Sequence, residues 1–529
     1  MTGRGSLHVQ GVVWRLSDRG GQLLTAADLD LHAHLAAGRA QTVKDGAHRS
    51  VYRVRTAGSD LYWKHAKFNG PRAWGRDVLR GPKAGIEFRR LEELRAKGIP
   101  TVSPLAWGRI EGLWSRGSFL VTEAVPNAVT LGDYLTAETF SVARRRAIAF
   151  KLADLMARVH AAGFVHADLH PGNILLDADD PAGVWRLIDV HDLESAGGPL
   201  GPAARVKNLV TLNRWFSLRT SFSDRRAFWA AYAATANMPD AAGGEIEQIT
   251  LSSNSKLWLS RDRRCVTANK DFCPIDFGGN PGHVRRDAPA ATFSVMADPE
   301  AVLRQPATAV IKDSRTSLVA VVRAGGPAFV LKRINIKRWY TALANLVRPS
   351  PAMRSWTGAC ALDNRRIRTP RTFAVAHARR SGLPREGYLL MEHLPEAKTL
   401  DEIPDFPASR LLGESARFIR RMHQRGVAHR DLKASNIMVN GGELLLIDLV
   451  GLECWNRVRT SRRRRDLTRL CVSSLRMPGV THATRLRWLK VYFGRNAAEW
   501  ADWKAWWKDI HRRCLGKLKQ NRVRGRNVN

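Results

Sequence analysis

The feature that most constrains this chain is an internal duplication. The stretch GFVHADLHPGNILLD starts at Gly163, and GVAHRDLKASNIMVN starts at Gly426. Both read His-x-Asp-Leu-x-x-x-Asn, followed by apolar residues and then by an isolated LIDV or LIDL. Further segments match in the same order, among them TVKDGAHRSVYRV with VIKDSRTSLVAVV and FLVTEAVPNAVTL with YLLMEHLPEAKTL. Ordered matches along the whole chain indicate two copies of one domain.

Two domains also suit the length, because 529 residues are too many for one hydrophobic core. The Pro/Gly/Ala-rich segment from Gly278 to Thr292 contains the predicted boundary. We therefore predict one domain over residues 25–285 and a second over 300–529. A last match, Trp-x-x-x-x-Arg-Arg-Cys, lies near the end of each half, from Trp258 and from Trp507. We interpret it as a core tryptophan followed by a solvated arginine pair.

Each half has the same expected architecture, which the first half illustrates. Alternating apolar residues over 50–66 predict two strands around a Gly-Ser-Asp turn, and SFLVTEAV predicts a buried strand. The helical periodicity over 83–97 ends before Gly98 and Pro100, and a long amphipathic helix is expected over 141–163. The fold class is thus α+β: a small sheet-containing N-terminal lobe and a mainly helical C-terminal lobe, present twice.

The repeated polar stretch contains residue types that suit phosphoryl transfer. Asp168 and Asn173 lie five positions apart in a loop that follows a helix, and the next hairpin ends at Asp189. One carboxylate can orient an acceptor hydroxyl, while an amide oxygen and a second carboxylate suit a magnesium ion on nucleotide phosphates. Lys64, on an otherwise apolar strand, is placed to neutralise phosphates, and Glu87 is placed to hold that lysine. An Asp/Asn-capped turn would explain a single occurrence, but not two in register with a lysine and a second aspartate.

These motifs resemble the protein-kinase-like fold, and specifically the bacterial lipopolysaccharide core kinases that act on heptose and Kdo. The resemblance covers about 240 residues in each half and implies ATP with Mg²⁺ or Mn²⁺ as cofactors. It implies an ion pair between Lys64 and Glu87, a catalytic base at Asp168 and metal ligands at Asn173 and Asp189. The strand that ends in Glu123 in the first half and in Glu392 in the second would contact the nucleotide.

In the second half the resemblance implies the same roles for Lys332, Asp431, Asn436 and Asp448, in the same order, and a contact between Lys433 and the transferred phosphate. Two departures from the kinase pattern stand out.

Neither half has a GxGxxG loop, since the hairpins read KDGAHRS and KDSRTSL. The alignment also places Ser355 where the first half has Glu87. Either Lys332 has another partner, for which Asp363 is a candidate, or the second half is catalytically weak. The histidines of the repeat are expected to be structural: His166 and His429 in the loop, and His160 and His423 in helix packing.

The charge of +37 indicates an anionic partner. From Leu452 onward, basic residues outnumber acidic ones roughly fourfold. Nucleic acid is disfavoured, because the basic tail lacks an interleaved aromatic platform. The N-terminus has no apolar signal segment and the six cysteines are scattered, which favours a cytoplasmic location with free thiols.

We therefore expect an ATP-dependent kinase that phosphorylates a hydroxyl of a lipopolysaccharide core sugar or a similar anionic glycolipid, with peripheral contact to the inner face of the cytoplasmic membrane. The alternatives are a kinase for protein Ser/Thr or a small molecule, and a scaffold with one degenerate, pseudokinase half.

Overall fold

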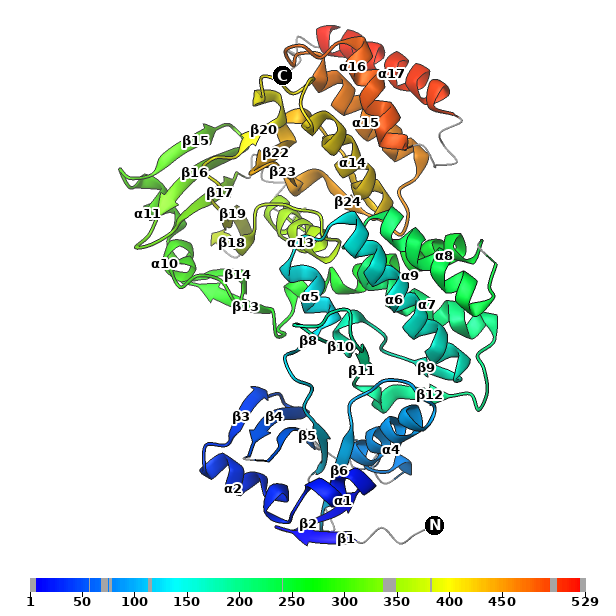
Figure 1. Cartoon of the computed structure of the whole chain (residues 1–529). Coiled ribbons are helices and arrows are strands. Elements are labelled where there is room, and N and C mark those ends of the chain that lie inside the picture. Colours follow the sequence, from blue (N-terminus) through cyan, green and yellow to red (C-terminus); the bar gives the residue numbers. More distant parts are fainter. Residues whose placement is uncertain are drawn as a thin grey trace. The chain divides into compact units, whose positions relative to one another are not determined.

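The computed structural model describes residues 6–56, 58–67, 75, 79–112, 117–239, 241–335, 349–380, 383–494 and 502–523. The chain divides into two compact units, Met1–Thr250 and Leu251–Asn529 (Figure 1). Helix α9 (Ala242–Arg261) continues across this division. Each unit contains one large antiparallel sheet and one lobe of helices, so the predicted α+β architecture is confirmed.

The sheet of the first unit has seven strands, and Lys64 lies on the fifth of them in spatial order. In that strand, β5, Lys64 is flanked by Val51 of β4 and Leu120 of β7. The spatial order is β1 (Ser6–Val9), β2 (Val12–Leu16), β6 (Pro104–Ile110), β7 (Gly117–Glu123), β5 (Asp60–Lys67), β4 (Arg49–Arg55) and β3 (Ala40–Lys44).

The second sheet repeats this order strand for strand. Lys332 of β17 is flanked by Val319 and Leu389, as Lys64 is by its neighbours. The order is β13 (Phe272–Phe277), β14 (Asn280–Arg285), β18 (Thr372–Arg380), β19 (Leu383–Glu392), β17 (Ala328–Ile334), β16 (Ser317–Arg323) and β15 (Ala309–Asp313).

The sheets place the domain boundaries differently from the sequence-based prediction. Strands β1 and β2 precede residue 25, where the first domain was expected to begin, yet β2 pairs with β6. Strands β13 and β14 lie within residues 25–285, the predicted first domain, yet β14 pairs with β18 of the second unit. Both hairpins pair with strands far along the chain, so local composition gave no sign of where they belong.

One helix lies against each sheet, and these two helices have the same length. They are α4 (Lys83–Ala96) and α13 (Pro351–Asn364). The helix over 83–97 was predicted from the spacing of Ile86, Leu91 and Leu94; in α4 Leu91 and Leu94 are buried with Phe88, and Ile86 is half-buried. Short helices complete each sheet-containing lobe: α1 (Asp18–Leu23), α2 (Leu31–Ala36), α10 (Ala291–Ala297) and α11 (Pro299–Arg304).

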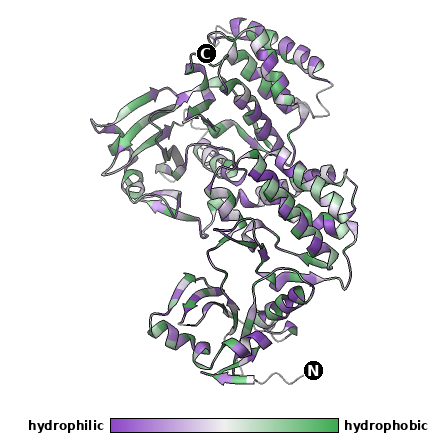
Figure 2. Ribbon diagram, viewed as in Figure 1, coloured by the Kyte–Doolittle hydropathy of each residue, from purple (hydrophilic) through white to green (hydrophobic). Residues whose placement is uncertain are grey.

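The helical lobes supply the largest hydrophobic cores, and hydrophobic and hydrophilic residues alternate along their helices (Figure 2). The helix predicted over 141–163 is α6 (Val142–Ala161), which starts at an N-cap of Ser141. The remaining helices are α5 (Leu131–Ala137), α7 (Pro202–Phe216) and α8 (Phe222–Ala236) in the first unit, and α14 (Leu411–Gln424), α15 (Thr460–Ser474), α16 (His482–Phe493) and α17 (Trp503–Val523) in the second.

Small sheets hold the repeated polar loop in each unit. They are β11–β10–β8 (Arg186–Leu187, Ile174–Asp177, Ala128–Thr130) with β12–β9 (Leu193–Ser195, Phe164–His166), and β20–β22–β23 (Lys398–Thr399, Ile437–Asn440, Glu443–Leu446) with β21–β24 (Val427–His429, Leu452–Cys454).

The Trp-x-x-x-x-Arg-Arg-Cys match is not a structural equivalence. Cys265 lies in a 3-10 helix after α9 and packs with the sheet-side core of the second unit. Cys514 lies inside α17 and packs in a helical core. The six cysteines have free thiols, as expected. Among the described residues, no helix is both long and apolar enough to cross a membrane.

Candidate functional site

The centre of the candidate site in the first unit is a buried ion pair. The Lys64 Nζ atom lies 2.6 Å from Glu87 Oε1, and their side chains are 14% and 6% exposed. Strand β5 presents Lys64 between apolar neighbours, and α4 presents Glu87 one turn after its start. Breaking such a pair is costly, because the remaining charge stays buried without compensation. The structure thus fixes the Lys64 ammonium in one position.

Asp189 faces the same lysine from the hairpin that follows the polar loop. Its backbone is left-handed, with φ of 61°, which turns the chain sharply between β11 and the next 3-10 helix. Its carboxylate accepts hydrogen bonds of 2.7 and 2.9 Å from Arg49 and lies 3.6 Å from Lys64 Nζ. Burial alone raises the pKa of Asp189, but His191, Lys64 and Arg49 together hold that pKa well below its usual range. The carboxylate is therefore ionised at neutral pH.

The polar loop is joined to Asp189 through its backbone. Asn173 Nδ2 donates to the Asp168 carbonyl at 2.8 Å, and Ile188 N donates to the Asn173 carbonyl at 3.0 Å. These bonds fix Asn173 beside the residue that precedes Asp189. The Asp168 side chain is 75% exposed and lies 3.7 Å from His170 Nε2. The Asp168 carboxylate is thus presented to solvent, where the hydroxyl of a phosphate acceptor could reach it.

Buried histidines anchor this loop, in agreement with the structural role expected for them. His166 Nε2 lies 3.3 Å from the Ile188 carbonyl. His160 bonds the Tyr232 hydroxyl at 2.7 Å and Asn208 Oδ1 at 3.0 Å, and Asn208 donates to the His166 carbonyl. Burial lowers the pKa of His160 to about 4, so this ring is neutral at pH 7.

The second unit repeats this anchor with one change. His423 bonds the Tyr492 hydroxyl at 2.8 Å, and Asp466 replaces the asparagine. Asp466 accepts from the backbone N–H of His429, whose Nε2 lies 3.0 Å from the Asp448 carbonyl.

The ion pair, by contrast, is not repeated. Ser355 is the fifth residue of α13, as Glu87 is of α4, and its hydroxyl donates to the Pro351 carbonyl within its own helix. Lys332 Nζ instead lies 2.9 Å from Asp448 Oδ1. Asp363, the candidate substitute, pairs with Arg285 and not with the lysine. The suggestion that Asp363 replaces Glu87 is therefore wrong, because residue 363 lies two helical turns beyond residue 355.

The second polar loop also differs in charge. Asn436 Nδ2 donates to the Asp431 carbonyl at 2.9 Å, as in the first unit. Here, however, Arg469 donates to Asp431 Oδ1 at 2.7 Å, and Lys433 Nζ lies 3.8 Å from Oδ2. The equivalent positions of the first unit hold neutral Thr211 and a histidine. Asp431 is thus already engaged by cations.

Glu123 and Glu392, the last residues of β7 and β19, each contact an arginine. Glu123 forms a two-pronged pair with Arg19, at 2.8 and 3.0 Å. Glu392 accepts from the backbone N–H of Arg371 at 3.1 Å. Their expected contact with a nucleotide stays a prediction.

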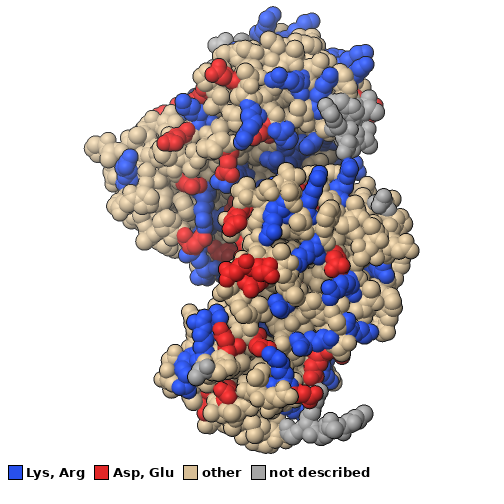
Figure 3. All heavy atoms as spheres, viewed as in Figure 1, with Lys and Arg blue, Asp and Glu red and all other residues tan. Residues whose placement is uncertain are grey.

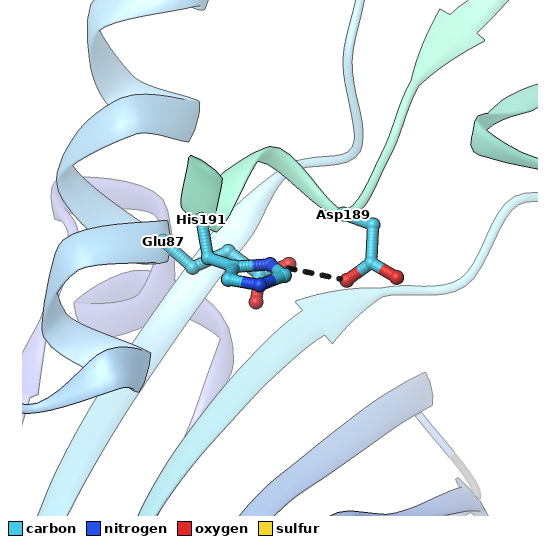
Figure 4. Close-up of side chains that lie close together, drawn as sticks. All are labelled: Glu87, Asp189 and His191. Atoms are coloured by element: carbon cyan, nitrogen blue, oxygen red, sulfur yellow. Dashed lines mark ion pairs between the residues drawn. The ribbon is translucent and has the colours of Figure 1, made fainter. Parts of the chain in front are cut away.

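Oxygen-rich donor sets suit a magnesium ion in this site. Glu87, Asp189 and His191 offer ligand atoms that all lie within 4.8 Å of one another (Figure 4). Because Asn173 donates through its amide nitrogen, its amide oxygen remains available as a further ligand. Glu87 is engaged by Lys64 at 2.6 Å, so the oxygen atoms that fit a divalent cation best are those of Asp189 and Asn173.

The sequence reasoning missed three residues of these sites. Arg49 stands in the KDGAHRS hairpin, which was considered only for its lack of glycines. His191 follows Asp189 by two positions, so proximity was the available signal. Arg469 lies 38 residues after Asp431 in a basic run, and nothing in the sequence separates it from its neighbours.

Comparison with protein families gives one match that extends over most of the chain. The model of the "Lipopolysaccharide kinase (Kdo/WaaP) family" matches residues 39–232 and again 334–492. Each matched region lies within one structural copy, and the second begins at the last residue of β17, after Lys332.

Comparison with individual proteins gives shorter matches. The chain is 40% identical over 93 residues to a 3-deoxy-D-manno-octulosonic acid kinase of Xanthomonas campestris pv. campestris (strain B100), and 41% identical to one of Xanthomonas axonopodis pv. citri (strain 306). Each match covers 17% of this chain and 35% of the relative, so the chain spans about a third of the relatives' length. A solved structure titled "WaaP in complex with acyl carrier protein" aligns with 45% of this chain and 97% of its own, at 21% identity and a TM-score of 0.34.

Proposed function

Because this chain belongs to the lipopolysaccharide kinase (Kdo/WaaP) family, we propose that it transfers the γ-phosphate of ATP to a hydroxyl of a lipopolysaccharide core sugar or a similar envelope glycolipid. The observation that carries this proposal is the chain of contacts from Glu87 through Lys64 to Asp189, with Asp168 exposed on the adjoining loop. Phosphoryl transfer depends mainly on positioning and charge stabilisation, which this arrangement supplies.

Each residue of the first unit has a defined task in this proposal. Lys64, held by Glu87, binds the α- and β-phosphates, and Asp168 accepts the proton of the attacking hydroxyl. Asn173 and Asp189 would hold Mg²⁺, which neutralises charge on the phosphates when bound. Arg49 is paired with Asp189 before ATP binds, and its guanidinium group would turn part of its hydrogen bonding to the phosphates of bound ATP.

We assign the chemistry mainly to the first unit. In the second unit Asp431 is paired with Arg469, and Lys332 is paired with Asp448 in place of a glutamate. The Arg469 pairing competes with the task of a base, and in the part of the chain that the structure describes Lys332 has no glutamate to hold it. A cation on the second aspartate is common to both units, since Asp189 contacts Arg49 and Lys64. On this proposal the first domain is an active kinase and the second is a weaker copy. The first domain then includes β1 and β2, and the second includes β13 and β14.

The net positive charge of the chain supports a proposal for the phosphate acceptor and for the place of the protein in the cell. The acceptor would be an anionic glycolipid, and basic side chains are spread over the face shown in Figure 3. We propose peripheral contact with the anionic inner face of the cytoplasmic membrane.

The test is transfer of radioactive phosphate from γ-labelled ATP in the presence of Mg²⁺. Purified lipopolysaccharide, total cell protein and small sugars are offered separately, with Asp168→Asn as the control. Label that enters lipopolysaccharide and depends on Asp168 supports the proposal. Label that enters only protein or small sugars favours the alternative kinases. If calorimetry detects no binding of nucleotide, the proposal that this chain is an ATP-dependent kinase is refuted.

A further inference from the structure

The second unit contains a pocket lined mainly by arginines. It has a volume of about 410 Å³ and lies beside α14 and the turn between β22 and β23. Five arginines line it together with only two carboxylates, a composition unlike that of the apolar sites that bind most small molecules. The charged lining residues are Arg366, Arg368, Arg410, Arg417, Arg421, Glu414 and Glu443.

The two carboxylates are already paired. Arg410 Nε lies 2.6 Å from Glu414, and Arg368 Nη1 lies 3.0 Å from Glu443. Among the described residues, no ion pair involves the other three arginines, Arg366, Arg417 and Arg421. The pKa of Arg421 is lowered, by burial first and then by the neighbouring positive charges of Arg417 and Arg420. The pocket thus holds three arginines without an ion-pair partner among the described residues, and the repulsion between Arg417 and Arg421 outweighs the attraction of Glu414 for Arg421.

The first unit fills the corresponding space. Its β10–β11 hairpin is longer and reaches back to α6, where Lys151 donates to the carbonyls of Ala182 and Gly183. Trp185 of this loop is 3% exposed, and the Lys151 ammonium lies over its ring. In the second unit the hairpin turns through only two glycines, Gly441 and Gly442, both at positive φ. The shorter turn leaves the space over α14 open.

Two helix residues that face this space have changed the sign of their charge. The histidines His160 and His423 make equivalent contacts, and counting back from them along each helix aligns Asp154 with Arg417. The same count aligns Lys151 with Glu414, which is the opposite change, and Arg158 with Arg421, which is no change. On this helix, Arg417 is thus the lining arginine that is specific to the second copy.

Arg366 provides a separate observation. It lies two residues after α13 at φ of 49°, as Gly98 lies two residues after α4 at φ of 70°. The next residue, Ile99 or Ile367, donates to a leucine carbonyl five positions back in both copies, so the two positions are equivalent. Glycine adopts this conformation freely, whereas an arginine there is strained. Strained residues persist where the surroundings require the side chain, and they cluster at ligand sites.

From these observations we infer that the pocket beside α14 binds a ligand with clustered phosphate groups, held by the guanidinium groups of Arg366, Arg417 and Arg421. Arginine matches phosphate through paired N–H donors, and a multiply charged anion would relieve the repulsion among these residues. The pocket lies at the turn of the β22–β23 hairpin, whereas Asn436 and Asp448 lie at its other end, about 13 Å away for strands of four residues. The site is therefore separate from the candidate catalytic site, and the inference does not depend on which unit transfers phosphate.

The phosphate groups could belong to a soluble molecule or to a membrane headgroup, so the experiment has two arms. Full-length protein is titrated with inorganic tripolyphosphate by calorimetry, and it is sedimented with vesicles that contain phosphatidylglycerol. The pocket variant is Arg417→Gln/Arg421→Gln, and the matched control is Arg512→Gln/Arg513→Gln on α17, which removes the same charge elsewhere in the unit. Arg366→Gly is the second variant, because it restores the glycine of the first copy and removes backbone strain.

We expect the pocket variant to lose about tenfold in affinity relative to the control, as loss of charge-assisted hydrogen bonds does. A loss confined to tripolyphosphate identifies a soluble ligand, and a loss confined to vesicles identifies a headgroup. Arg366→Gly should weaken the same binding while its melting temperature stays equal or rises. The inference is overturned if wild-type protein binds neither probe, or if both pocket variants bind as tightly as the control.

Discussion

Replacing Glu87 with serine converts the first unit to the arrangement of the second and tests the role of the ion pair. The pair is short, at 2.6 Å, and nearly buried. Removing one partner of a buried pair costs about 3–5 kcal/mol. Lys64 keeps Asp189 at 3.6 Å as a second partner, so we expect the lower end, about 3 kcal/mol. For a unit of this size each kcal/mol lowers the melting temperature by about 2–4 °C, which gives about 6–12 °C.

The variant should also lose activity, because Lys64 is then free to move toward Asp189 and away from the phosphates. Misplacement of such a group costs about 10²-fold in turnover. Calorimetric melting and phosphate transfer from labelled ATP measure the two effects. The control is Glu93→Ser on the same helix, which removes an exposed pair with Arg90 worth at most about 1 kcal/mol. If Glu87→Ser behaves like this control in both measurements, the ion pair is not what positions the lysine.

Four further predictions concern the division of labour, pH and the membrane. Asp168→Asn should lower phosphate transfer by about 10² to 10⁴, whereas Asp431→Asn should leave most of it; the reverse outcome would make the second unit the enzyme. Arg469→Thr, in the Asp168→Asn background, should raise the residual transfer several-fold by releasing Asp431, and an unchanged rate would show that the arginine is not what limits the second unit. The first unit should lose stability as the pH falls from about 6.5 to 4, because the folded state keeps His160 neutral with a pKa of about 4 while the unfolded chain binds the proton. In denaturant titrations, the free energy of unfolding of His160→Gln should fall by about 3 kcal/mol less over that pH range than that of the wild type. An identical fall in both proteins would contradict burial of His160 as the cause. Sedimentation with anionic vesicles should weaken steeply between low salt and 0.15 M, where charges are screened over about 8 Å, and equal binding to neutral vesicles would contradict an electrostatic contact.

The duplication and the main elements could be predicted because they depend on local patterns. Strand alternation around Lys64 and the helical period around Glu87 are properties of neighbouring residues, and the structure confirms both elements. Copy-to-copy alignment also placed Ser355 correctly at the position of Glu87, because the two helices have equal length. The loop from Asp168 to Asn173 was recognisable because its hydrogen bonds join residues five positions apart.

What depended on distant pairing was not predictable. Strands β13 and β14 carry no local sign that they complete the second sheet, since the pairing of β14 with β18 spans about ninety residues. The partner of Lys332 was sought nearby, at Asp363, but the fold supplies Asp448, 116 residues away. Short-range spacing says nothing about such contacts, because chain closure over long loops is decided by packing of the whole core.

The sequence by itself determined that this protein is a duplicated phosphotransferase-type fold with a lysine, an aspartate–asparagine loop and a second aspartate in each copy. Only the tertiary structure decided how the copies differ. Arg469 reaches Asp431 in one copy, and a two-glycine turn leaves an arginine-lined pocket open in the same copy. Both differences arise where side chains from separate elements converge, and convergence in space is a property of the packed chain, not of any one segment.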